Sequence, residues 1–116
     1  MFKVLYSQEF TEWLMSLDDD TFDDVQAMIE LLKEYGYNLA RPYADTLNGS
    51  NLTNLKELRI QSNGRPLRAF FVFDPLRQAV ILCAGDKTGD KRFYKKMIPL
   101  AETIYQRYLD QLELPK

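Results

Sequence analysis

The sequence predicts one α+β domain over residues 1–116, in which an antiparallel sheet is layered with helices in the order β-α-α-β-β-β-α. In the first third and at the end of the chain, apolar residues recur at three- and four-residue spacing, as in amphipathic helices. Between them lie short runs rich in aromatic and β-branched residues, as in strands. With 46% hydrophobic and 28% charged residues, the composition is that of a globular protein.

The first third is expected to form a strand and a helical hairpin. Residues 2–6 are rich in aromatic and β-branched side chains and predict the strand. Ser7 can cap a helix over residues 8–17, whose apolar stripe includes Phe10 and Leu14. A second helix begins at one of residues 18–20 and ends at Gly36.

The aspartates of residues 18–24 have two interpretations. Carboxylates at this spacing could hold magnesium. Acidic side chains at a helix start also cap free N–H groups and complement the helix dipole. The capping interpretation is favoured because it requires nothing beyond the predicted helix.

The middle of the chain predicts a loop followed by an antiparallel meander. Residues 37–54 carry turn-forming residues and little periodicity, which indicates a loop. Three strands are expected over residues 55–61, 67–74 and 79–86. The connections between them are short enough for hairpins.

The C-terminal segment, residues 90–112, has helical spacing of its apolar residues. Pro99 lies inside it and predicts a kink or a break into two helices.

Charge is segregated along the chain although the net charge is only -2. Residues 1–34 carry two basic and nine acidic side chains, whereas residues 56–96 carry ten basic and four acidic ones. A local basic field is the signature of a polyanionic partner. The alternative is a solvated surface with scattered charges, but the size of the segregation favours nucleic acid.

Strand alternation predicts which of these cations share a surface. Successive residues of a strand point to opposite faces of a sheet, and every second residue shares a face. By this rule Arg59 and Arg68 can converge on one face. Lys87 and Lys91 can close the rim of that face, provided the strands are adjacent.

Several classes of protein are not expected. The N-terminus lacks the apolar region of a secretory signal, and no apolar run approaches the length of a membrane span, which predicts a cytoplasmic protein. Cys83 lies in an apolar run and is interpreted as a small buried hydrophobe. The chain has no histidine, so no zinc or redox metal site and no cofactor are expected.

An ordered set of motifs resembles a known family. The set comprises Leu55-Lys56-Glu57-Leu58-Arg59, then Gly64, then Arg68-Ala69-Phe70-Phe71-Val72-Phe73-Asp74, then Ile81-Leu82-Cys83-Ala84-Gly85-Asp86-Lys87 with Lys91 and Tyr94. It is similar to the RelE/ParE superfamily of toxins from bacterial toxin-antitoxin pairs, and most similar to its HigB, or phage Gp49-like, branch. The resemblance covers nearly the whole chain.

The resemblance implies a RelE-like, microbial RNase-like fold and ribosome-dependent cleavage of mRNA. It also implies a cognate helix-turn-helix antitoxin as the partner. The family's site residues would fall on Lys56, Arg59, Arg68, Lys87 and Tyr94. Nearby cations are expected to contact RNA, namely Arg65, Lys91, Arg92 and Lys95. This chain departs from the family in having no histidine and in lacking the usual paired lysines before the last helix, which leaves Lys87 and Lys91 as alternatives.

These side chains suit metal-free RNA cleavage. Arginine forks can offset the charge that develops on phosphorus. Neighbouring cations favour the neutral form of a lysine, so Lys56 or Lys87 is expected to act as general base. Tyr94 either stacks on a base or packs in the core. The competing functions are a ParE-like gyrase inhibitor and a non-enzymatic, phage-derived module that binds nucleic acid or protein.

Overall fold

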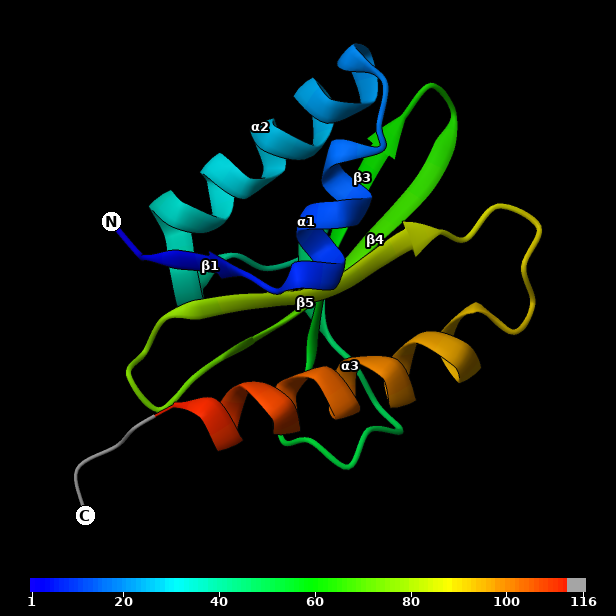
Figure 1. The fold of residues 1–116 in the computed structure, drawn as a ribbon. Helices are drawn as coiled ribbons and strands as arrows, with labels where there is room; N and C mark the ends of the chain where they lie inside the picture. The colour runs from blue at the N-terminus through cyan, green and yellow to red at the C-terminus, as the bar shows by residue number, and fades with distance from the viewer. Residues whose placement is uncertain (113–116) are drawn as a thin grey trace.

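The computed structural model, which describes residues 1–112, shows a five-stranded sheet with helices on both faces (Figure 1). The strand order is β1-β5-β4-β3-β2, with β1 parallel to β5 and the other neighbours antiparallel. The strands are β1 (Val4–Tyr6), β2 (Ala44–Thr46), β3 (Lys56–Ser62), β4 (Arg65–Phe73) and β5 (Ala79–Asp86). The helices are α1 (Gln8–Met15), α2 (Asp19–Tyr35) and α3 (Phe93–Gln111). The predicted α+β class is confirmed.

Both helices of the N-terminal hairpin begin at side-chain caps. The Ser7 hydroxyl accepts a hydrogen bond from the Phe10 amide at 2.9 Å, and the Asp18 carboxylate accepts one from the Thr21 amide at 2.8 Å. Asp18 is therefore the N-cap of α2, which agrees with the capping interpretation of the acidic run. α2 ends at Gly36, whose φ of +50° favours glycine.

The sheet has an apolar core on each face. α1 and α2 cover one face, where Phe10, Ile29, Leu58 and Phe71 are buried together. α3 covers the other face, with a second core that includes Phe70, Leu82, Cys83, Phe93 and Ile104. The predicted strand alternation is confirmed, because neighbouring residues of β4 alternate between the two cores. Burial raises the pKa of the Cys83 thiol to about 12, as expected for a core cysteine.

Two elements differ from the sequence prediction. The loop predicted over residues 37–54 contains a 3₁₀ turn, Gly36–Asn38, and the short edge strand β2. β2 is three residues long and exists through its pairing with β3, which local sequence patterns do not reveal. α3 runs through Pro99 as one helix, so the alternative of a break into two helices is wrong. Among residues 1–112, no helix is long and apolar enough to cross a membrane.

Candidate nucleic-acid interface

Arg59 of β3 and Arg68 of β4 lie directly opposite each other in the sheet. The Arg59 amide donates to the Tyr43 carbonyl at 2.8 Å on the outer edge of β3, so it does not bond to β4. In such a non-hydrogen-bonded antiparallel pair the two Cα atoms are about 4.5 Å apart and the side chains are close. The two arginines therefore form a cationic pair on the α3 face, as strand alternation predicted.

Glu57 holds this pair together. Its side chain is only 3% exposed, and one carboxylate oxygen accepts a hydrogen bond from Arg59 Nε at 3.1 Å. The other oxygen lies 3.5 Å from Arg68 Nε and accepts a hydrogen bond from the Tyr94 hydroxyl at 2.6 Å. Like charges opposite each other destabilise a sheet, and this carboxylate offsets the repulsion. Glu57 thus connects two strands and the last helix.

A second carboxylate contacts Arg59 from β2. Asp45 accepts hydrogen bonds from Arg59 at 3.3 Å and from Arg41 at 2.8 Å. The hydrogen bond to Arg41, together with the charges of Arg41 and Arg59, holds the pKa of Asp45 below its usual value. Arg59, with a third of its side chain exposed, is braced on two sides while its guanidinium stays accessible.

Arg68 retains an unused donor. Its side chain is 14% exposed, and Nη1 donates to the carbonyl of Leu67 at 2.9 Å. Within residues 1–112, the buried Arg68 Nε has no hydrogen-bond partner, because its approach to Glu57 does not meet hydrogen-bond geometry. A buried guanidinium donor without a partner is costly, and the Glu57 carboxylate 3.5 Å away offsets its charge without a hydrogen bond.

α3 places Tyr94 against this cluster because Gly85 lets the helix approach. Gly85 pairs with Arg68 in the sheet, and a Cβ at this position would lie 3.1 Å from the Phe93 ring. Burial and the hydrogen bond to Glu57 raise the pKa of Tyr94, so its hydroxyl remains protonated at neutral pH. Tyr94 packs partly on Phe70, which agrees with the core role considered for it, and its contact with a base stays a prediction.

Lys87 also reaches the cluster. Its ammonium lies 5.7 Å from the centre of the Tyr94 ring, within the range of a cation–π contact. Tyr94 also lines a hollow of about 250 Å³, together with Asp45, Glu57 and Arg59. This hollow is here called the Tyr94 hollow.

Two residues expected in the site lie on the opposite face of the sheet. Lys56 shares a face with Leu58, and its ammonium donates to Thr46 at 2.8 Å. Arg65 shares a face with Leu67, and its guanidinium donates to Thr21 of α2 at 2.7 Å. Neither side chain joins Arg59 and Arg68, because the two-residue period of a strand directs both toward the α1 and α2 layer.

The remaining cations surround the start of α3. Lys91, Arg92 and Lys95 are exposed there, separate from the Glu57 cluster. Their exposure is compatible with contacts to an extended anion, whereas Arg59 and Arg68 are held in one place.

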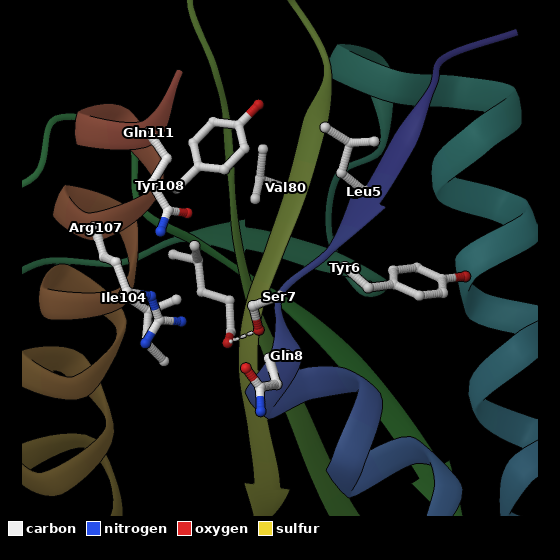
Figure 2. A pocket seen from close by; sticks show the side chains of 10 residues that line it. Leu5, Tyr6, Ser7, Gln8, Val80, Ile104, Arg107, Tyr108 and Gln111 are labelled. Carbon is white, nitrogen blue, oxygen red and sulfur yellow. Dashed lines mark hydrogen bonds between the residues drawn. The ribbon is translucent and has the colours of Figure 1, made fainter. Parts of the chain in front are cut away.

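Figure 2 shows another hollow, of about 310 Å³, between β1, β5 and α3. The cation in its lining is Arg107, whose guanidinium donates to the Glu9 carboxylate at 2.8 Å. The hollow lies at the β1 side of the sheet, whereas the arginine pair lies on β3 and β4. We assign it no part in the candidate interface.

Comparison with known proteins identifies the family. Residues 12–106 match the family model described as "Phage derived protein Gp49-like (DUF891)". The chain belongs to this Gp49-like family. The resemblance to the HigB, or phage Gp49-like, branch is therefore confirmed.

Two relatives come from Mycobacterium tuberculosis (strain ATCC 25618 / H37Rv). The Gp49-like chain is 42% identical over 108 residues to the protein named "Putative toxin HigB2", a match that covers 91% of this chain and 54% of that protein. It is 38% identical over 107 residues to "Putative toxin HigB3", covering 91% of this chain and 92% of that protein. The chain thus spans about half the length of HigB2 and nearly all of HigB3.

Proposed function

We propose that this Gp49-like protein is the toxin of a toxin-antitoxin pair and acts as a ribosome-dependent, metal-independent mRNA endonuclease in the cytoplasm. The names of HigB2 and HigB3 support the toxin assignment. The arginine pair with Tyr94 and Lys87 supports the nuclease assignment, because fixed cations beside a hollow suit a phosphodiester. The proposed partners are mRNA on the ribosome and a helix-turn-helix antitoxin.

The proposed reaction is an attack of a ribose 2′-oxygen on the adjacent phosphorus. The 2′-hydroxyl loses its proton, the bond from phosphorus to the 5′-oxygen breaks, and the leaving 5′-oxygen gains a proton. The products are a 2′,3′-cyclic phosphate and a 5′-hydroxyl. Arg59 and Arg68 are proposed to offset the charge on the phosphate oxygens.

Lys87 is the proposed residue for proton transfer. Lys56, the other candidate for general base, lies on the opposite face of the sheet. The position of Lys87 over the Tyr94 ring favours it over the exposed Lys91. Tyr94 is proposed to orient the nucleotide, and Lys91, Arg92 and Lys95 to contact the RNA backbone outside the site.

Inducible expression in bacteria with mapping of transcript ends tests this function. We expect growth arrest with cuts in translated mRNA, and cleavage of ribosome-bound mRNA by the purified protein. Gyrase inhibition would instead appear as loss of supercoiling activity with intact transcripts. A module that only binds would leave both transcripts and supercoiling unchanged.

Arg68→Ala should abolish most cleavage. Loss of one preorganised donor to a transition state typically lowers kcat by about 10²–10³-fold. Arg77→Ala is the matched control, because Arg77 lies in the β4–β5 turn against Tyr37, away from the site. Rates are measured on ribosome-bound mRNA, and circular dichroism verifies folding. Undiminished cleavage by Arg68→Ala would remove Arg68 from the site.

A further inference from the structure

The outer edge of β3 is only partly covered by β2. β2 pairs with the first part of β3, from Thr46 opposite Lys56 to Ala44 opposite Leu58. The Arg59 amide then donates to Tyr43 on this edge. Backbone groups of an antiparallel strand alternate in direction, so the N–H and C=O of Gln61 also point to this edge. A backbone donor and acceptor are therefore presented beyond the end of β2.

A hollow of about 450 Å³ lies at this edge, between α2 and residues 42–43. It is here called the Tyr43 hollow. Its lining includes both Arg59 and Arg68, together with Gln61, Asp24 and Tyr43. Tyr43 is 48% exposed, so a ligand in the hollow could reach its side chain.

The Tyr43 hollow and the Tyr94 hollow share Arg59. Each of them has one tyrosine in its lining. A phosphate held between Arg59 and Arg68 would thus have an aromatic ring in the hollow on either side. Single-stranded nucleic acid is commonly bound in this way, by cations that contact the backbone and aromatic rings that stack on successive bases.

Asp24 indicates which part of a nucleotide the Tyr43 hollow would accept. Its carboxylate accepts a hydrogen bond from the Ser62 hydroxyl at 2.6 Å, which fixes its position on the wall. A carboxylate repels a second phosphate but can accept a hydrogen bond from a base. The hollow therefore suits a base whose own phosphate is bound by the arginines.

We propose that the Tyr43 hollow is the subsite for one unstacked RNA base next to the phosphate bound by Arg59 and Arg68. Tyr43 stacks on the base, and the Gln61 backbone with Asp24 contacts its edge. This inference rests on the proposed nuclease function and adds a base-binding position to it.

Binding of a non-cleavable RNA tests the proposal. The probe is a short fluorescent single-stranded RNA with 2′-O-methyl groups, which block attack by the 2′-oxygen. Tyr43→Ala should weaken binding about 5- to 150-fold, the range for loss of one stacked base, whereas Tyr43→Phe should retain it. Tyr6→Ala is the matched control, because Tyr6 is also exposed, at 37%, but lines the hollow of Figure 2, whose lining does not include Tyr43. Thermal unfolding verifies that each variant is folded.

Abasic substitutions in the probe identify the base itself. Removing one base should weaken binding to the wild-type protein by a similar factor and should have no further effect on Tyr43→Ala. This non-additivity would show that the missing base and Tyr43 contact each other. Full additivity at every probe position would overturn the proposal.

Cleavage on the ribosome provides a second readout. Tyr43→Ala should lower cleavage and broaden the base preference next to the cut, whereas Tyr6→Ala should change neither. If wild-type protein cuts transcripts and Tyr43→Ala matches it in rate, preference and probe affinity, the subsite is wrong and the nuclease function stands. If wild-type protein neither binds the probe nor cuts transcripts, both are wrong. Loss of antitoxin binding by Tyr43→Ala with unchanged RNA affinity would assign the hollow to a protein partner instead.

Discussion

Glu57 is an acidic residue at the centre of a basic surface, and its contacts explain why it is tolerated there. Both carboxylate oxygens are engaged, by Arg59 on one side and by Tyr94 on the other, with Arg68 nearby. A buried charge is stable only when it is paired and hydrogen-bonded. Glu57 therefore positions the arginines and the tyrosine that the proposed reaction needs.

Replacing Glu57 with glutamine tests whether its negative charge, and not only its shape, stabilises the cluster. The amide keeps the shape but removes the countercharge from two arginines, and breaking a buried pair typically costs about 3–5 kcal/mol. We expect the midpoint of urea unfolding to fall and the pKa of Tyr94 to move toward its usual value. Near-ultraviolet absorbance of the phenolate measures that pKa. Glu30→Gln, which affects an exposed pair with Lys33, should leave both measurements nearly unchanged.

The site could be predicted from the sequence only in part. Arg59 and Arg68 were found because strand alternation and pairing depend on local patterns. The same alternation, applied to Lys56 and Arg65, would have placed them with Leu58 and Leu67 on the other face. The role of Glu57 cannot be predicted from local patterns, because its contact with Tyr94 joins residues that are far apart in the chain.

At the scale of elements, the junction after α2 depends on close contact between Gly36 and Phe2. A Cβ at Gly36 would overlap the Phe2 ring, which is itself packed against Tyr37 and Phe73. Gly36 also has a positive φ, which strains any other residue. This one position thus sets the end of α2 and the course of the chain before β1.

Gly36→Ala should destabilise the fold by about 1–3 kcal/mol or more, because overpacking adds to the backbone strain. Gly49→Ala is the control, since Gly49 also has a positive φ, of +83°, but a Cβ there would meet no atom within 4 Å. The difference between the two free energies of unfolding isolates the contact with Phe2. Equal losses would mean that the ring moves aside without cost.

The helices and the three long strands follow from periodicity and capping, which are local properties. β2 does not, because three residues cannot establish a period and their strand geometry comes from pairing with β3. β2, which the sequence does not predict, matters for the site. It brings Asp45 to Arg59, and it ends where Tyr43 and Gln61 lie at the open edge of β3.

At the scale of the whole molecule, the sheet separates the two kinds of charge seen in the sequence. The acidic residues of positions 1–34 lie mainly on α1 and α2, on one face. Arg59, Arg68 and Lys87 lie toward α3, on the other, beside Glu57 and Tyr94. An anion that approaches the α3 side is therefore attracted by cations while most of the acidic side chains lie behind the sheet.

Stability should fall at alkaline pH. Burial raises the pKa values of Tyr94, Tyr105 and Tyr108, and hydrogen bonds to Glu57 and Asp74 raise those of Tyr94 and Tyr108 further. In the unfolded chain these phenols ionise near pH 10, as free tyrosine does. Their contribution to the free energy of unfolding is therefore complete below about pH 10. It is lost as the pH rises toward the pKa values of these tyrosines in the folded protein.

Urea unfolding over a range of alkaline pH measures this loss. Tyr108→Phe should reduce the slope of stability against pH, because it removes one of the groups responsible. Tyr6→Phe, at an exposed tyrosine, serves as the control and should keep the wild-type slope. If Tyr108→Phe kept the wild-type slope, Tyr108 would not contribute to the loss of stability at alkaline pH.

The parallel pairing of β1 with β5 has a consequence for biosynthesis. Val4 lies opposite Ala79, so the first strand leaves the exit tunnel long before its neighbour in the sheet is translated. α3, which carries Tyr94, follows later still. A nascent chain therefore cannot assemble the arginines, Glu57 and Tyr94 into one cluster until the start of α3 has left the exit tunnel.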